Sequence, residues 1–543
     1  MKIYAKDYGI LPECDCTDLL SNFFCELAKI DGEKTVLFEN GTYYLNRSKC
    51  RRIYRAITNT TSAKEYKNLT DVNMHYVPFI FENIKNLVLD GNGSTFVIDG
   101  KVTNAVISDC ENITIKNLAI KTISPNVHKL TVLSKTAFSV TFSLCSESKY
   151  SKEDDGYYFN GNGYRLGFFE NKEKAFWTST VKPNNKNKIS RTSHPFKFAN
   201  KIEKISPYKF KAQYPFYRNF DIGQTFYIFD AHRSDVGIFI EKSKNIILDN
   251  VTQNFNYSLA YVAQDCVNLT IENCAFAPEK DSALELASLA DFMQICMCSG
   301  KVIIRNNVFD GASDDALNVH GIHFGIDKID GNKLTVSFRH PQSWGFNPLH
   351  DGDRIEFINP KTLLSVDKNK IISSKMTDNY RIELELESSV PNNYLQYVIE
   401  DTDRCPELLF ENNTLNRIIT RAILYTSRGK CVIRNNHFIS NTMSGVLLSD
   451  DAKSWYESGM CRDVTIEDNI FDYCAQTPIL IKPENRVHNG AVHKNITIKN
   501  NTFKKYKGYC IKAKSTDKIT IENNSFNSNK HIHTKGCNHI KEI

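Results

Sequence analysis

Short apolar runs with strand-like alternation recur along the chain, and each ends in a polar pair. Examples are "VIIRNNVF", "VTIEDNIF" and "NITIKNNTF". A repeat of 20 to 35 residues is typical of a parallel β-solenoid, in which coils of three short strands stack on one another. With the second polar position as marker, the copies lie 23 to 34 residues apart except for one gap of 106, at Asn250, Asn273, Asn307, Asn413, Asn436, Asn469, Asn501 and Asn524.

The repeat also predicts which side chains face the core. In "VTIEDNIF" the alternation directs Val464 and Ile466, then Ile470 and Phe471, inward around a turn at Asp468-Asn469. Asparagine is favoured at such turns because it tolerates left-handed backbone and bonds its neighbours in the adjacent coil. We therefore interpret the marker asparagines as a structural ladder without a catalytic role.

Two stretches lack the repeat and instead show alternating runs separated by polar turns, which favours small antiparallel barrels or sandwiches inserted between coils. The segment "TDLLSNFFCELAKI" is apolar at helical spacing and is expected to cap the open end of the solenoid. The predicted division is a cap with first coils, an insertion, central coils, a second insertion and C-terminal coils, at residues 1–125, 126–232, 233–321, 322–402 and 403–543.

Composition narrows the function classes. The 68 basic and 62 acidic residues leave a net charge of only +6, and the basic residues are scattered, so nucleic acid is not an expected partner. No apolar run suits a membrane span, and no signal peptide is seen. We expect a cytoplasmic location for the sequence as written, with a secreted or periplasmic one as the alternative if a signal was removed.

The 16 cysteines are spread over the whole length without metal-like clustering. This pattern is typical of reduced, buried thiols, so we expect neither a metal site nor a cofactor.

The stretch "DGASDDALNVHG" contains adjacent acids, Asp314 and Asp315. In a regular strand they would face opposite sides, but "GAS" permits a bend that exposes both at a strand end on one lateral face. Asp291 precedes Asp314 by 23 residues, the shortest coil spacing, so we expect it one coil away and in register. Three crowded carboxylates have pKa values pushed apart, which suits one acid and one base; a calcium site is the structural alternative.

The runs "SLADFMQICMCSG" and "DGASDDALNVHG", with "TRAILYTSRGK", "LLSDDAKSWYESGM" and "ILIKPEN", resemble glycoside hydrolase family 110. The early "FENGTYYL" and "ITNTT" fit too. The resemblance implies a right-handed parallel β-helix (pectin-lyase-like) with β-barrel insertions. It also implies an inverting exo-α-1,3-galactosidase of the type that cleaves the blood-group B determinant.

Within the resemblance, the family's three acids correspond to Asp291, Asp314 and Asp315. By analogy with polygalacturonase solenoids, Asp314 is the expected acid, while Asp291 and Asp315 hold the water; exchange of Asp314 and Asp315 is the alternative. An α-galactoside oligosaccharide or glycoconjugate is the implied substrate.

Further positions are weaker candidates for substrate binding. Asn318 and His320 bond the sugar, orient the acids or stabilise a turn. Arg421 and Glu457 line the pocket or form surface ion pairs, and Trp455 forms an aromatic platform or packs against an insertion. Gln294 stands where the family commonly has His, and Glu484 is a further pocket candidate.

Two other functions stay open at this point. A polygalacturonase-like or polysaccharide-lyase-like solenoid would act on another glycan, and a non-catalytic solenoid would only bind carbohydrate. The extended edges and the insertions also leave surface for a homodimer.

Overall fold

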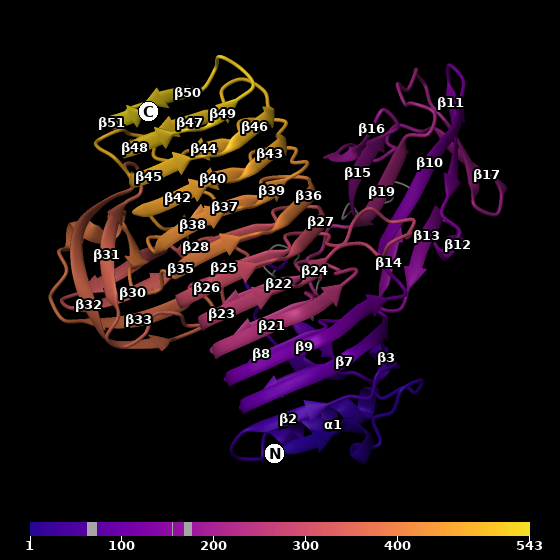
Figure 1. Ribbon diagram of the computed structural model, residues 1–543, viewed down its shortest axis with the longest axis horizontal. Coiled ribbons are helices and arrows are strands. Elements are labelled where there is room, and N and C mark those ends of the chain that lie inside the picture. The colour runs from indigo at the N-terminus through magenta and orange to yellow at the C-terminus, as the bar shows by residue number, and fades with distance from the viewer. Residues whose placement is uncertain (62–72, 155, 168–175) are drawn as a thin grey trace.

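The computed structural model describes residues 1–61, 73–154, 156–167 and 176–543. Its body is a parallel β-helix whose strands form a 21-stranded and a 12-stranded sheet (Figure 1). One coil runs through β23 (Val267–Glu272), β24 (Ala275–Phe276) and β25 (Met293–Cys296). The next coil runs through β26 (Ser299–Arg305), β27 (Val308–Ala312) and β28 (Leu317–Ile322). Each strand pairs in parallel with its counterpart in the next coil, which confirms the predicted fold class.

The smaller sheet of the solenoid carries the residues that matter below. This sheet extends along the solenoid, because each successive coil adds one strand to it. They are β6 (Phe79–Glu82), β8 (Ala105–Ser108), β20 (Ile238–Glu241), β22 (Tyr261–Gln264), β25, β28, β37 (Ile423–Thr426), β40 (Val446–Leu448), β44 (Ile479–Ile481), β47 (Ile511–Lys514) and β50 (Ile532–Lys535), with β41 (Glu457–Ser458) beside β28.

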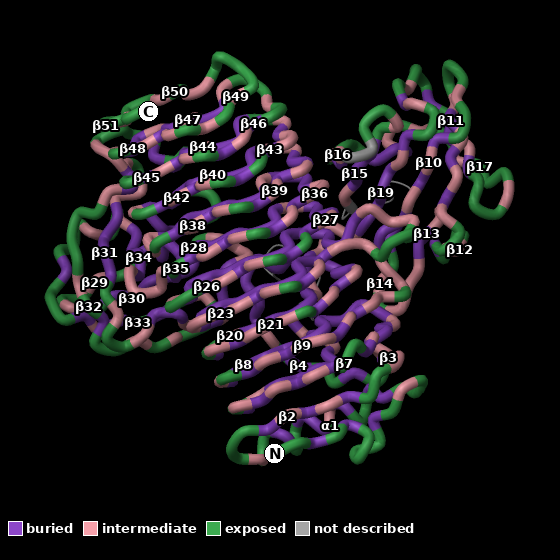
Figure 2. Tube along the Cα trace, viewed as in Figure 1, coloured by how far each residue is buried: buried purple, intermediate pink, exposed green. Residues whose placement is uncertain are grey.

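The strands of the solenoid carry many buried residues (Figure 2). The solenoid interior is apolar because strands of this kind turn alternate side chains inward, and most of the buried ones are hydrophobic. Aromatic rings stack from coil to coil: the Phe438 and Phe471 rings are 4.4 Å apart, and the Phe471 and Phe503 rings 4.9 Å apart. Val464, Ile466 and Phe471 are buried as predicted, but Ile470 is 39% exposed. Alternation around the turn allows only one of these two neighbours to face inward, and Phe471 takes that place.

Asparagines form two adjacent columns at the turn rather than one ladder. The first column has left-handed backbone and includes Asn250, Asn273 and Asn435. The second is buried, and each side-chain oxygen accepts from the backbone N–H of its neighbour, as between Asn413 and Asn436 at 2.9 Å. The markers Asn250 and Asn273 belong to the first column, because Val251 and Cys274 take the buried place in those coils.

The first insertion is a seven-stranded antiparallel sheet with a three-stranded sheet packed on it, so it is sandwich-like rather than a closed barrel. It projects from one side of the solenoid (Figure 1). Its strands are β10 (Val127–Lys135), β11 (Ser139–Leu144), β15 (Phe176–Lys182), β16 (Asn185–Arg191), β17 (Lys201–Ser206), β18 (Lys209–Gln213) and β19 (Thr225–Asp230), with β12 (Tyr150–Glu153), β13 (Gly156–Gly161) and β14 (Tyr164–Gly167) in the smaller sheet.

The second insertion is a closed antiparallel barrel on the other side of the solenoid (Figure 1). Its strands are β29 (Phe324–Asp330), β30 (Lys333–Ser337), β31 (Arg354–Asn359), β32 (Leu364–Met376), β33 (Arg381–Leu386) and β34 (Val398–Asp401).

The predicted helix is α1 (Thr17–Leu27), and it caps the first coil. Its Phe24 ring lies 4.4 Å from the ring of Phe81 on β6. Among the described residues, no helix is long and apolar enough to cross a membrane.

The buried asparagine column makes a prediction about stability. In Asn436→Ala, the N–H of Asn413 and the carbonyl of Phe410 lose their partners inside the core, so we expect unfolding in urea to require about 2–4 kcal/mol less free energy. Asn435→Gly is the matched control, since glycine accepts the φ of 53° at that position; its effect should stay within about 0.5 kcal/mol. Equal stability of the two variants would contradict the assignment.

Candidate active site

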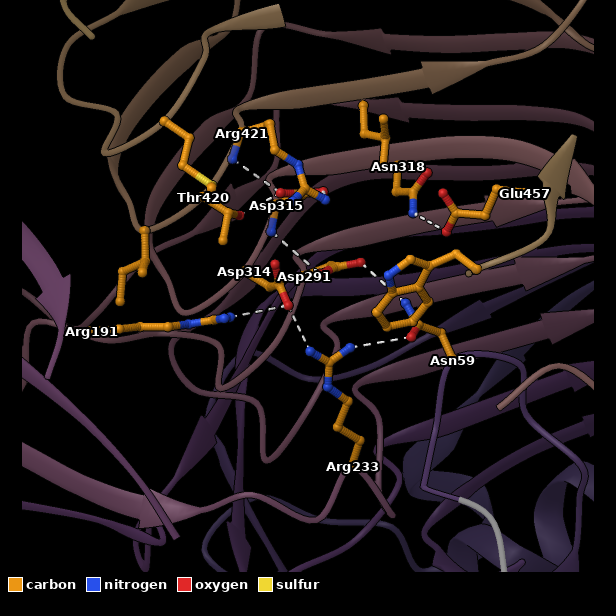
Figure 3. A pocket seen from close by; sticks show the side chains of 14 residues that line it. Asn59, Arg191, Arg233, Asp291, Asp314, Asp315, Asn318, Thr420, Arg421 and Glu457 are labelled. Carbon is orange, nitrogen blue, oxygen red and sulfur yellow. Dashed lines mark hydrogen bonds and ion pairs between the residues drawn. The ribbon is translucent and has the colours of Figure 1, made fainter. Parts of the chain in front are cut away.

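A cavity of about 340 Å³ lies where the solenoid meets the first insertion (Figure 3). All three predicted acids line it. The remaining lining residues are Asn59, Arg191, Arg233, Asn318, Ile419, Thr420, Arg421, Leu424, Met443, Trp455 and Glu457.

Asp314 and Asp315 lie in the bend between β27 and β28. Gly311 opens this bend with a φ of +84°, and a Cβ there would come within 2.3 Å of the Glu285 carbonyl oxygen. The side chains of larger residues are therefore excluded, and "DGAS" bends as predicted. The consecutive acids can then both reach the cavity.

The register between the coils differs from the expected one by a residue. Met293 pairs with Leu317, an offset of 24, so Asp291 is level with Asp315 and not with Asp314. The backbone agrees: Phe292 N–H donates to the Asp315 carbonyl at 2.9 Å. Arg421 is level with Asp315 in the following coil, because Leu317 pairs with Ile423.

The acids are also more buried than expected for a lateral face. Asp291 is 3% exposed and Asp315 1%, and the side chain of Asp314 is 15% exposed. Residues from outside the solenoid cover them: Arg191 comes from β16, and Asn59 from a loop near the N-terminus.

Asp314 lies between two arginines. One of its oxygens accepts from Arg233 Nη2 at 2.6 Å and from Arg191 Nη2 at 3.3 Å. Burial raises the pKa of Asp314, but Arg233, Arg191 and Arg421 outweigh burial and hold this pKa below its ordinary value. Asp314 is therefore ionised at neutral pH in the free protein.

Asp315 and Asp291 have environments of the opposite kind. Asp315 accepts from Thr420 Oγ1 and from Arg421 Nη2, the latter at 2.6 Å, yet burial dominates and raises its pKa to about 6. Asp291 has the Asn59 amide at 3.4 Å and the Asp315 backbone N–H at 3.3 Å as hydrogen-bond donors. Burial and the charges of Asp314 and Asp315 raise the pKa of Asp291 well above its ordinary value. Burial therefore favours the protonated form of both members of this pair, and most strongly that of Asp291.

Comparison with known proteins assigns the chain to a family. The chain is 33% identical to "Alpha-1,3-galactosidase A" of Bacteroides thetaiotaomicron over 498 residues, which cover 90% of this chain and 85% of that protein. The chain belongs to the α-1,3-galactosidase family, glycoside hydrolase family 110. It is thus a glycoside hydrolase with a carbohydrate substrate.

Other relatives of this family 110 chain give the same picture. "Alpha-1,3-galactosidase A" of Bacteroides fragilis is 29% identical, covering 96% of this chain and 87% of that protein. "Alpha-1,3-galactosidase B" of Phocaeicola vulgatus is 25% identical, covering 97% and 90%. Family models match as "GLAA-B beta-barrel domain II" at residues 333–396 and as "Right handed beta helix region" at residues 378–526.

Hydrogen bonds connect polar side chains in the wall of the cavity and directly behind it. Asn318 Nδ2 donates to Glu457 Oε1 at 3.0 Å, and both residues line the cavity. His320 Nδ1 lies 2.8 Å from the Gly321 carbonyl and must donate to it, so His320 Nε2 accepts from Gln294 Nε2 at 2.8 Å. Gln294 and His320 are buried and do not line the cavity, so the structure places them behind the predicted substrate contacts.

Of two further residues predicted to bind substrate, one lines the cavity of the hydrolase and the other does not. Trp455 lines the cavity, is 44% exposed and stacks on His340 of the second insertion with 4.4 Å between ring centres. Glu484 lies outside the cavity and pairs with Lys482 at 2.8 Å, so the prediction that it lines the pocket was wrong.

The periodic pattern of the sequence missed several lining residues. Asn59 and Arg233 stand outside the coil repeat, and Arg191 belongs to the first insertion. Thr420 precedes Arg421 in a coil turn. Only the register between coils, which makes Thr420 level with Asp314 and Arg421 level with Asp315, shows that Thr420 lies beside the acids. "ITNTT", with left-handed Asn59, was the one local signal.

The opposed pKa shifts predict how stability of the glycosidase depends on pH. The folded pKa of Asp291 lies above the unfolded one, so its contribution to stability is full at low pH and is lost as pH rises through the folded pKa. We expect Asp291→Asn to raise the melting temperature at pH 7 by about 1–3 °C, with a gain that shrinks toward pH 4.

Asp314→Asn should act in the reverse direction. The lowered pKa of Asp314 contributes stability above the unfolded pKa, and the variant loses it at pH 7 because Arg233 loses its ionised partner. Differential scanning fluorimetry from pH 4 to 8 measures both variants. A melting temperature at pH 7 that is higher for Asp314→Asn than for Asp291→Asn would contradict the charge assignment.

Proposed function

We propose that this glycosidase removes terminal α-1,3-linked galactose from oligosaccharides or glycoconjugates, by a single displacement with inversion. The observation that carries the proposal is one pocket lined by three carboxylates whose pKa values are shifted in opposite directions. In the proposed free state the Asp291–Asp315 pair, whose pKa values are raised, carries one proton, and Asp314, whose pKa is lowered, is ionised. The relatives named α-1,3-galactosidase support the choice of sugar and linkage.

Inversion needs an acid at the glycosidic oxygen and a base for water on the opposite face of the sugar, with the carboxyl groups roughly 6.5–9.5 Å apart. Asp291 and Asp315 are level on adjacent coils and share a hydrogen bond, so they act as one unit that holds the water. Asp314, bound from the other direction by Arg191 and Arg233, is the proposed acid.

This assignment requires the proton to move when substrate binds. In the free protein it lies on the Asp291–Asp315 pair, so the reactive state has it on Asp314. Asp314 then gives the proton to the glycosidic oxygen as the bond from that oxygen to C1 breaks. Water attacks C1, and its proton passes to the Asp291–Asp315 pair, which restores the free state. The two arginines stabilise Asp314 as it becomes ionised.

The shape of the site fits exo action. A cavity of about 340 Å³ suits a terminal pyranose and part of its neighbour rather than a long polymer. Trp455 offers a partly exposed ring to the apolar face of galactose, while Asn318 and Glu457 offer polar groups to its hydroxyls.

Action on acidic sugars is less well supported. Such an enzyme needs cations that are free to bind the substrate carboxylate. Arg233 and Arg421 each already bind an acid of the site at 2.6 Å, and Arg191 also contacts Asp314.

The first test is product stereochemistry. Incubation with α-1,3-, α-1,4- and α-1,6-linked galactosides in EDTA, followed at once by proton NMR, should show β-galactose released from the α-1,3 linkage. Initial α-galactose would exclude inversion, and loss of activity in EDTA would favour a calcium-dependent enzyme. Asp291→Asn, Asp314→Asn and Asp315→Asn should each lower kcat/KM about 10³-fold or more, with Glu484→Gln as the control outside the cavity.

The second test separates acid from base. A leaving group such as 2,4-dinitrophenolate departs without a proton, so a variant lacking the acid keeps most activity on that α-galactoside while losing activity on the disaccharide. We expect this pattern for Asp314→Asn only. If Asp291→Asn shows this pattern instead, then Asp291 is the general acid, and the assignment of that role to Asp314 is wrong.

A further inference from the structure

Trp177 lies outside the cavity, on β15 of the first insertion, yet it contacts two cavity residues. The guanidinium carbon of Arg191 is 4.7 Å from the centre of the Trp177 ring, and that of Arg233 is 5.5 Å away. Both distances are within the range of cation–π contacts. One ring therefore touches an arginine of the neighbouring strand β16 and an arginine of the segment that leads back to the solenoid.

These are the two arginines that bind Asp314. Arg233 Nη2 donates to Asp314 at 2.6 Å and Arg191 Nη2 at 3.3 Å, both to the same carboxylate oxygen. A guanidinium group is planar, so its face can rest on a ring while its edge donates hydrogen bonds. Two like charges converging on one oxygen repel each other, and the electron-rich face of the indole offsets part of that repulsion.

We propose that Trp177 is a positioning residue of the reaction, whose ring holds Arg191 and Arg233 in the geometry in which both donate to Asp314. The inference rests on the proposed function, because it assigns Asp314 a part in the chemistry. It makes the first insertion part of the catalytic apparatus, although Arg191 is the one residue that the described part of this insertion contributes to the cavity wall.

Contacts with the C-terminal coils hold the first insertion against the solenoid near the cavity. Thr442 Oγ1, in a C-terminal coil, lies 3.4 Å from the Ile189 carbonyl oxygen of β16, and Lys188 Nζ lies 3.3 Å from the Tyr473 hydroxyl oxygen. On the other side, the Trp177 ring packs edge-on against Phe229 of β19. Trp177 is thus held between the sheet of the insertion and the arginines.

Loss of the ring has a predictable electrostatic consequence. If the arginines move away from Asp314, the pKa of Asp314 rises, and the pKa values of the coupled Asp291 and Asp315 rise with it because the cations stabilise all three ionised forms. Both limbs of the pH dependence of kcat/KM then move to higher pH. This direction does not depend on which aspartate is the acid.

The kinetic experiment uses Trp177→Leu, which removes the ring, and Trp177→Phe, which keeps a smaller one. We expect kcat/KM on the α-1,3-galactoside to fall about tenfold in Trp177→Leu and less in Trp177→Phe. Both limbs should rise by about half a pH unit in Trp177→Leu. The control Phe142→Leu weakens the core of the same insertion away from the arginines. A fall in rate with unmoved limbs, as in that control, would overturn the proposal.

A second measurement does not need galactosidase activity. In a protein with Trp344→Phe and Trp455→Phe, Trp177 is the single tryptophan, and its emission reports the cations on its ring. Adding Asp314→Asn removes the anion that Arg191 and Arg233 share, although Arg191 keeps the Ser313 carbonyl and Arg233 keeps Asn59, and should change that emission. Asp403→Asn, which breaks an ion pair with Arg354 beside the second insertion, should not. Unchanged emission in Asp314→Asn overturns the role of Trp177. If the wild-type protein has no galactosidase activity but the emission changes as expected, the proposed function is wrong while the contact of Trp177 with the two arginines stands.

Discussion

The site depends on the parallel register between neighbouring coils. Because strands in adjacent coils lie about 4.8 Å apart and pair in parallel, residues that are level across coils are forced into contact whatever their separation along the chain. Asp291, Asp315 and Arg421 are level in three consecutive coils, although 106 residues, including the whole barrel, separate the last two. The backbone hydrogen bonds of the sheet therefore fix the distances between charged groups that would otherwise repel.

That enforced proximity has an electrostatic cost, which the structure meets with cations from several sources. Arg421 comes from the solenoid itself, but Arg191 comes from the first insertion and Arg233 from the segment behind it. With Glu457, the cavity has four carboxylates and three guanidinium groups, so a single proton makes it neutral. The directions of the pKa shifts agree with this count, because burial favours the protonated form of Asp291 while the arginines favour the ionised form of Asp314.

The sequence allowed the coil architecture and the acids to be predicted, because both follow from local repetition. Coil spacing placed Asp291 beside the Asp314–Asp315 pair, but it missed the register by one residue because coil lengths vary, and the offset here is 24 residues both before the bend, at Ser288 and Ala312, and after it. Similarly, Gln294 and His320 were found as neighbours of the site, yet alternation alone did not show that they bond each other behind it. Arg191 and Arg233 were missed because their place depends on how an inserted domain docks, which no periodic pattern encodes.

The solenoid and the insertions therefore differ in which features of the site a substitution can alter. The solenoid cannot move Asp291 or Asp315 without breaking strand pairing, so the positions of these acids are fixed by the fold. The first insertion is bound to the C-terminal coils through side-chain contacts, such as those of Lys188 and Ile189, rather than through a continuous strand ladder. Substitutions in the insertions can therefore retune the charge and shape around a constant set of acids. His340, stacked on Trp455, and Trp177, in contact with Arg191, show that both insertions contact residues that line the cavity.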